Sequence, residues 1–76
     1  MTYSTTEGIA SRAQSARVAK GVTVDTLANG LGVSNSTMSR RLAGTYAWSA
    51  VEIAQAALIL GVSVDYLILG SEQATA

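Results

Sequence analysis

The most polar segment of the 76-residue sequence is residues 32–41, GVSNSTMSRR, in which most side chains form hydrogen bonds. Hydroxyl and amide groups both donate and accept hydrogen bonds, whereas the two adjacent arginines only donate and carry a fixed positive charge. Such a surface suits an anionic or hydrogen-bonding partner better than bond-making chemistry, because the sequence contains no histidine and no cysteine. We therefore interpret segment 32–41 as a binding surface.

The same composition argues against catalysis and against a metal centre. Without histidine or cysteine, a serine has no ordinary base to activate it, and a soft metal has no preferred ligand. The acidic residues Asp25, Glu52 and Asp65 fall near expected helix starts, where a negative charge meets the helix dipole favourably. We therefore expect no enzyme activity, no cofactor, no metal and no small-molecule ligand.

Charge is unevenly distributed, although the formal net charge is zero. Residues 1–41 carry +3 and residues 42–76 carry −3, because every arginine and the single lysine precede residue 42. This asymmetry fits one face for an anionic partner and another face for a different contact. A chance scatter of so few charges gives a similar count, so the motifs must decide between the two interpretations.

Short motifs divide the chain into helices. Gly-Val followed by Ser or Thr occurs at residues 21–23, 32–34 and 61–63, and each copy supplies a glycine to end one helix and a hydroxyl to cap the next. Ser49 and Glu52 form a capping box, and Trp48 and Ile53 occupy the positions of a hydrophobic staple. These signals predict helices over 6–20, 24–31 and 35–43, a fourth from Ser49 to about residue 60, and a fifth from 64 to a stop at Gly70.

The expected fold is all-α, a compact five-helix domain over residues 6–70, with residues 1–5 and 71–76 predicted to be disordered. Gly30 falls inside the second helix, where it costs about 1 kcal/mol relative to alanine, and close packing is its only evident reason. We expect these core residues: Ile9, Ala13, Ala16, Val18, Leu27, Ala28, Leu31, Ile53, Ala54, Ala57, Leu58 and Leu60.

The second and third helices are short and are joined by the three residues LGV, which is the arrangement of a helix-turn-helix. Ala28 is small at the place where the two helices must cross, and Gly32 allows the turn. The residues expected to fix both helices to the core are Leu27, Leu31, Val33 and Met38.

A helical wheel separates the faces of the third helix. Met38 and Leu42 point inward, Ser36 and Arg40 lie nearly opposite, and Arg41 borders the core side. Asn35 projects from the first turn, and Thr37 and Ser39 lie on the flanks. An asparagine can pair with adenine and an arginine with guanine in the DNA major groove, so this face suits base recognition. The alternative is a solvated helix face whose Ser and Asn residues only cap the helix.

The segment LANGLGVSNSTMSRRLAGTYAWSAVEIAQAALILGVSVDYLILG resembles the DNA-binding domain of the Cro and phage-repressor type of helix-turn-helix family, which is lambda-repressor-like. The similarity extends without a gap through IASRAQSARVAKGVTV, so it covers about residues 8–70. The resemblance implies five helices, with the third helix in the major groove, and a homodimer bound to a two-fold symmetric operator.

The resemblance also implies roles for individual residues. Asn35, Ser36 and Arg40 match base-contacting positions. The residues expected on the phosphate backbone are Thr23, Thr37, Ser39, Arg41, Thr45 and Tyr46. Trp48 is expected in the core or at its rim as half of a staple rather than as a wedge between bases. For Tyr46, a hydroxyl that reaches phosphate and a ring that packs in the loop remain equally open.

Two departures from the family pattern bear on affinity. Leu42 stands where many relatives carry an acid, which leaves Arg17 without that partner, and the loop TYAW after Gly44 is not basic. Few phosphate contacts predict a shallow salt dependence, because each neutralised phosphate contributes about −0.9 to the slope of log K against log salt.

The favoured function is a sequence-specific regulator of transcription that binds double-stranded DNA at a palindromic operator as a homodimer. Two half-sites multiply the specificity of one recognition helix, and Val64, Tyr66 and Leu67 of the apolar fifth helix are the expected dimer contacts. The alternative is a protein-binding module of the same fold, such as an antirepressor or a partner subunit. The sequence shows neither a signal peptide nor an apolar run of about 20 residues, so we expect a cytoplasmic protein without membrane contact.

Overall fold

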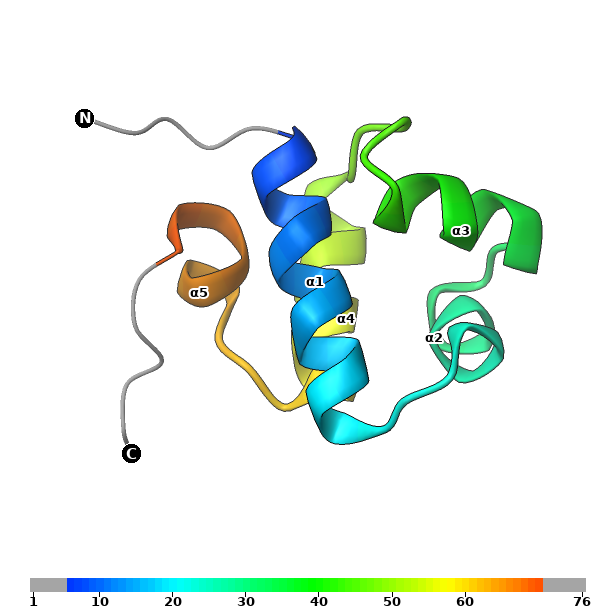
Figure 1. Ribbon diagram of the computed structural model, residues 1–76, viewed down its shortest axis with the longest axis horizontal. Coiled ribbons are helices and arrows are strands. Elements are labelled where there is room, and N and C mark those ends of the chain that lie inside the picture. Colours follow the sequence, from blue (N-terminus) through cyan, green and yellow to red (C-terminus); the bar gives the residue numbers. More distant parts are fainter. Residues whose placement is uncertain (1–5, 71–76) are drawn as a thin grey trace.

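The computed structural model describes residues 6–70, and it places five helices in this range (Figure 1). They are α1 (Thr6–Lys20), α2 (Val24–Leu31), α3 (Asn35–Leu42), α4 (Ala50–Leu60) and α5 (Val64–Leu69). The all-α, five-helix prediction is therefore confirmed, and the predictions for residues 1–5 and 71–76 lie outside the described residues. The third helix ends one residue earlier than expected, with Ala43 as its C-cap.

The three Gly-Val motifs close their helices in the same way. Gly21, Gly32 and Gly61 have φ angles of 70°, 73° and 69°, in the left-handed region that glycine tolerates best. The following valine donates its backbone N–H to the carbonyl five residues earlier, at 3.0 Å in each case, and its side chain packs against the core. The next Ser or Thr caps the following helix. The predicted joints between helices are confirmed.

The helices pack around a core that lies between α1, α4 and the helix-turn-helix. In Figure 1, α1 and α4 cross the middle of the molecule, α5 lies on one side of them, and α2 and α3 lie on the other. Residues 6–70 contain no helix long and apolar enough to cross a membrane. The core cluster comprises Ile9, Ala13, Ala16, Leu27, Ala28, Leu31, Met38, Leu42, Trp48, Ile53, Ala56, Ala57, Leu60 and Leu67.

Three core predictions are wrong, because Val18, Ala54 and Leu58 are exposed. The error in α4 has a simple cause: nearly every residue of this helix is apolar, so its pattern does not select one inward face. The structure buries Ile53, Ala56, Ala57 and Leu60, which share one face at i, i+3, i+4 and i+7.

Gly30 is explained by the packing of α2 against α4. A Cβ atom at this position would collide with the side chain of Ile59 on α4. Trp48 and Ile53 both lie in the core, which confirms the buried interpretation of Trp48, and the capping box between Ser49 and Glu52 is present. The N-terminal turn of α4 is thus fixed by both polar and apolar contacts.

Candidate nucleic-acid interface

The turn between α2 and α3 sets the position of the third helix. Gly32 donates its N–H to the Asn29 carbonyl at 3.2 Å, and Val33 donates to the Ala28 carbonyl at 3.0 Å. Ala28 is 1% exposed and Met38 is fully buried. The two helices are therefore in close contact, and Met38 holds α3 against the core. The predicted helix-turn-helix is present, with its expected apolar residues in place.

The outward face of α3 is polar and exposed. Asn35, Ser36, Ser39 and Arg40 are all exposed, whereas Thr37 is half-buried. The helix sequence NSTMSRRL contains no acidic residue. The structure therefore brings the three residues predicted to contact bases, Asn35, Ser36 and Arg40, onto one accessible helix.

Two of the predicted backbone-contacting residues take part in matching caps. The Thr23 hydroxyl accepts a hydrogen bond from the backbone N–H of Thr26 at 3.0 Å and donates to its hydroxyl oxygen at 2.9 Å. Ser34 has the same two contacts with Thr37, at 3.1 and 3.0 Å. Since a hydroxyl both donates and accepts, the Thr37 O–H remains available to donate to another group.

The loop between α3 and α4 lies beside the end of the polar face. The Arg40 guanidinium carbon stands 5.8 Å from the centroid of the Tyr46 ring, a cation–π distance. Tyr46 is 42% exposed, and Thr45 is exposed beside it. The Tyr46 ring therefore contacts Arg40, and its edge remains open to solvent.

Arg41 does not join this surface. It forms an ion pair with Glu52 of α4, and the two side chains are only 17% and 15% exposed. Its backbone carbonyl accepts a hydrogen bond from the Trp48 indole N–H at 3.1 Å. The position of Arg41 at the border of the core turns its side chain toward α4, and the expectation that it reaches a phosphate stays a prediction.

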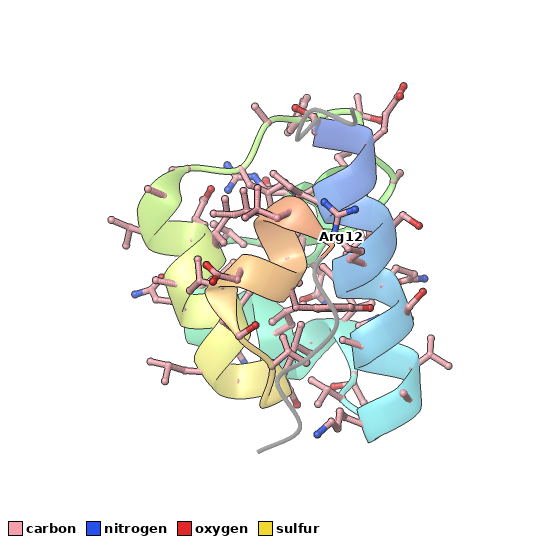
Figure 2. All side chains as sticks on the ribbon, turned by 90° about the vertical axis from the view of Figure 1, so that its left-hand side faces the viewer. Arg12 is labelled. Carbon is pink, nitrogen blue, oxygen red and sulfur yellow. The ribbon has the colours of Figure 1, made fainter. Side chains whose placement is uncertain are left out.

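Two more arginines bind to the protein itself. Arg12 of α1 donates to the carbonyls of Leu67 and Ile68 at the end of α5, both at 2.8 Å (Figure 2). Arg17, which sequence left without an acidic partner, donates to the Val22 carbonyl and to the Gln14 side chain, both at 2.9 Å.

Only Arg40 and Lys20, among the cations of residues 6–70, make no hydrogen bond or ion pair within that part of the chain. Most of the positively charged side chains in the first 41 residues therefore make contacts within the protein itself.

The three residues predicted to contact a second copy of the chain differ in their exposure to solvent. Val64 is 38% exposed and Tyr66 is half-buried, whereas Leu67 is fully buried. The prediction that Leu67 lies on a dimer surface is wrong, because this face of α5 packs into the core. Leu69, which sequence reasoning missed, is 63% exposed on the same helix.

Sequence reasoning also missed the second contact of Glu52. Its Oε1 accepts from the Ser49 N–H at 2.9 Å as the capping box requires, while its other oxygen meets Arg41. The capping box identified Glu52 in the sequence but not its partner Arg41, because ion pairs between different helices have no fixed spacing in the sequence. No local signal identifies the Arg12 contact with α5 for the same reason.

Comparisons with known proteins agree with this geometry. The sequence model of the BetR domain family matches residues 3–76. Two crystal structures of the clp gene regulator ClgR from Corynebacterium glutamicum are 31% identical to this chain and cover 82% of it, with TM-scores of 0.78 and 0.76. The chain spans 66% of the first ClgR chain, which is less than two thirds of its length, and 80% of the second.

Two further structures show the same fold. The restriction-modification controller protein C.AhdI from Aeromonas hydrophila is 27% identical over 83% of this chain and 96% of its own, with a TM-score of 0.74. SinR, a master regulator for biofilm formation whose structure was determined in complex with DNA, is 28% identical over 78% of this chain and 95% of its own, with a TM-score of 0.69. A search of curated protein sequences found no match.

The family match covers nearly the whole chain, and the solved structures share its fold over about four fifths of its length. The chain therefore belongs to the BetR domain family, and its fold is a lambda-repressor-like helix-turn-helix domain of the Cro and phage-repressor type.

Proposed function

We propose that this protein is a DNA-binding regulator of transcription that reads a palindromic operator as a homodimer, with α3 in the major groove. The observation that carries the proposal is the exposed, acid-free face of α3, held on a helix-turn-helix by the buried side chains of Met38 and Leu42. The ClgR, C.AhdI and SinR structures support it, since each is described as a regulator or controller and SinR was crystallised with DNA.

In this proposal Asn35, Ser36 and Arg40 contact base edges. Asn35 can pair bidentately with adenine and Arg40 with guanine, while the short Ser36 side chain allows the helix backbone to approach the bases. The N-terminus of α3 adds a partial positive charge for a phosphate. The residues proposed to contact the sugar-phosphate backbone are Thr23, Thr37, Ser39, Thr45 and Tyr46.

The proposed dimer surface is the exposed side of α5. Val64 and Leu69 present apolar groups there, Tyr66 adds a half-buried ring, and Arg12 holds the end of the helix against α1. A homodimer gives two recognition helices with two-fold symmetry, so a site read by it has two half-sites about one helical turn apart. Occupation of such a site would block polymerase, which is the proposed mode of action.

Selection of bound sequences from a random DNA pool tests this proposal. We expect an enriched motif with two-fold symmetry and a half-site spacing of about 10 base pairs. Circular dichroism checks that the Arg40→Ala variant is folded, and we expect this variant to enrich no motif. Recovery of the same motif by that variant would remove α3 from the reading role, and a motif without symmetry would exclude the homodimer.

The alternative is a protein-binding module of this fold, and the internal use of three arginines favours it. Lysine and arginine contacts to phosphate provide most of the affinity of DNA-binding proteins, and here few cations remain for that purpose. If the pool yields no enriched sequence at low salt, while the protein is folded, the alternative is the better description.

A further inference from the structure

The end of α3 is attached to the start of α4 through a small set of contacts, here called the α3–α4 junction and formed by Arg41, Trp48 and Glu52. Residue 41 is held at two points: its carbonyl by the Trp48 indole N–H at 3.1 Å, and its guanidinium by the Glu52 carboxylate. Trp48 is 8% exposed, and Glu52 also accepts from the Ser49 N–H. The last turn of α3 is thus tied to an element that is itself anchored in the core.

Within residues 6–70, the Arg41 nitrogens Nε and Nη1 are buried, and Nη1 faces the Glu52 carboxylate in an ion pair. A buried guanidinium is costly unless an opposite charge stands beside it. This cost ties Arg41 to Glu52 and keeps it from the solvent, where a phosphate would lie. The neighbouring Arg40 lies about 100° away around the helix axis and is exposed.

We propose that Arg41 is a positioning residue: with Glu52 and Trp48 it sets the angle of α3 on the domain and makes no phosphate contact. The inference rests on the proposed function, because the angle matters only if α3 reads DNA. Base contacts need their donors and acceptors in register, whereas contacts made by charge alone tolerate misplacement. The α3–α4 junction therefore determines specificity without touching a base.

The direction in which one substitution changes operator affinity separates a positioning role for Arg41 from a phosphate contact. Glu52→Gln removes the negative charge but keeps the capping box, since Gln also serves at that position. If Arg41 positions α3, the loss of its partner weakens operator binding. If Arg41 binds phosphate, release from Glu52 makes it more available, and operator binding tightens.

The experiment compares Glu52→Gln, Arg41→Gln and the double variant on the sequence selected by the wild-type protein and on a scrambled duplex. We expect each single variant to bind the selected sequence about tenfold more weakly, the scale of coupling within one contacting pair, and to bind the scrambled duplex as the wild type does. The double variant, which has the wild-type net charge, is expected to be no weaker than either single variant.

Salt titration gives an independent measure. We expect the slope of log K against log salt to be the same for wild type and Arg41→Gln, whereas loss of a phosphate contact lowers its magnitude by about 0.9 per subunit. Asp65→Asn, which removes one acid from α5, is the control for a general effect of charge, and sedimentation equilibrium checks that it leaves self-association unchanged, because Asp65 lies on the helix of the proposed dimer surface. A lower slope for Arg41→Gln, or tighter binding by Glu52→Gln than by the control, overturns the proposal.

A measurement without DNA tests the positioning role of Arg41 separately from the proposed DNA-binding function. In two-dimensional NMR spectra of the free protein, both single variants are expected to shift the Trp48 indole N–H and the backbone amides of residues 36–42 together. Thermal unfolding confirms that each variant is folded at the temperature used. Unmoved α3 amides overturn the positioning role, even if the wild-type protein selects no DNA; shifted amides with no selected DNA leave the junction supported and the proposed function rejected.

Discussion

The helices α3 and α5 lie toward the two ends of the molecule (Figure 1). Both are short and each is held by an arginine, but the exposed groups of α3 are polar and those of α5 include apolar side chains. At α3 the arginine belongs to the helix and reaches out to Glu52, while the exposed face is polar. At α5 the arginine comes from α1 and binds the last carbonyls, while the exposed residues Val64 and Leu69 are apolar.

The difference fits the two proposed partners, DNA for α3 and a second copy of the chain for α5. Polar, acid-free groups on α3 can replace the hydrogen bonds that base edges make with water, whereas exposed apolar groups on α5 gain free energy only when another apolar surface covers them. Both helices need an anchor, because six to eight residues are too few for a stable isolated helix. The contacts that anchor the two helices occupy the positive charges of Arg41 and Arg12, which are then not available to bind DNA.

The largest effect is expected for Arg40→Ala, which removes the exposed cation from the polar end. Because a bidentate base contact contributes about 1–3 kcal/mol and a dimer makes two, affinity for the selected DNA should fall at least about 30-fold. Fluorescence anisotropy measures this loss, and Lys20→Ala, which removes one positive charge outside α3, is the matched control. An equal loss in both variants would mean that only the overall charge matters.

The next effect concerns the anchor of α5. Arg12→Met removes both hydrogen bonds to the Leu67 and Ile68 carbonyls but keeps an apolar stem, so unfolding should become easier by about 2 kcal/mol, the usual scale for bonds that involve a charged group. Urea denaturation followed by circular dichroism measures the change. Arg40→Ala should leave stability unaltered. An Arg12→Met protein as stable as the wild type would show that apolar packing alone holds α5.

A smaller effect should appear in self-association. Leu69→Gln on α5 is expected to weaken the dimer about tenfold in sedimentation equilibrium, because it replaces an apolar contact worth about 1–2 kcal/mol. Leu58→Gln is the control, since Leu58 is 84% exposed on α4, outside the proposed surface. The reverse result, in which only Leu58→Gln dissociates the dimer, would move the interface to α4.

The smallest effect is expected at Tyr46. Tyr46→Leu removes the ring beside Arg40 and should weaken binding to the selected DNA about two- to fivefold, as an exposed cation–π contact contributes about 0.5–1 kcal/mol. Tyr46→Phe keeps the ring and should recover the part of this loss that comes from the ring, whereas a contact of the hydroxyl with phosphate stays lost. If Phe is as weak as Leu, the hydroxyl rather than the ring makes the contact, which is the phosphate interpretation.

Local signals predicted the helices well. The glycines at 21, 32 and 61 and the hydroxyls of Thr23, Ser34, Ser49 and Ser63 act within a few residues of their own positions, so their effect can be read along the chain. The exposed face of α3 was predictable as well, because only Met38 and Leu42 gave that helix an inward direction. The same reasoning failed for α4, in which an almost continuous apolar sequence offers several faces.

The sequence by itself determined, to within one residue, where each helix begins and ends, and it determined which residues of α3 are exposed. The ends depend on local capping, and the exposed face depends on the period of a single helix. Tertiary structure alone decided the partners of Arg12 and Arg41. Arg12 meets a helix more than fifty residues away, and Arg41 meets Glu52 across the α3–α4 loop. A long charged side chain has no local preference for one distant partner, so only the packing of the helices selects Arg40 for the surface and Arg41 for the interior.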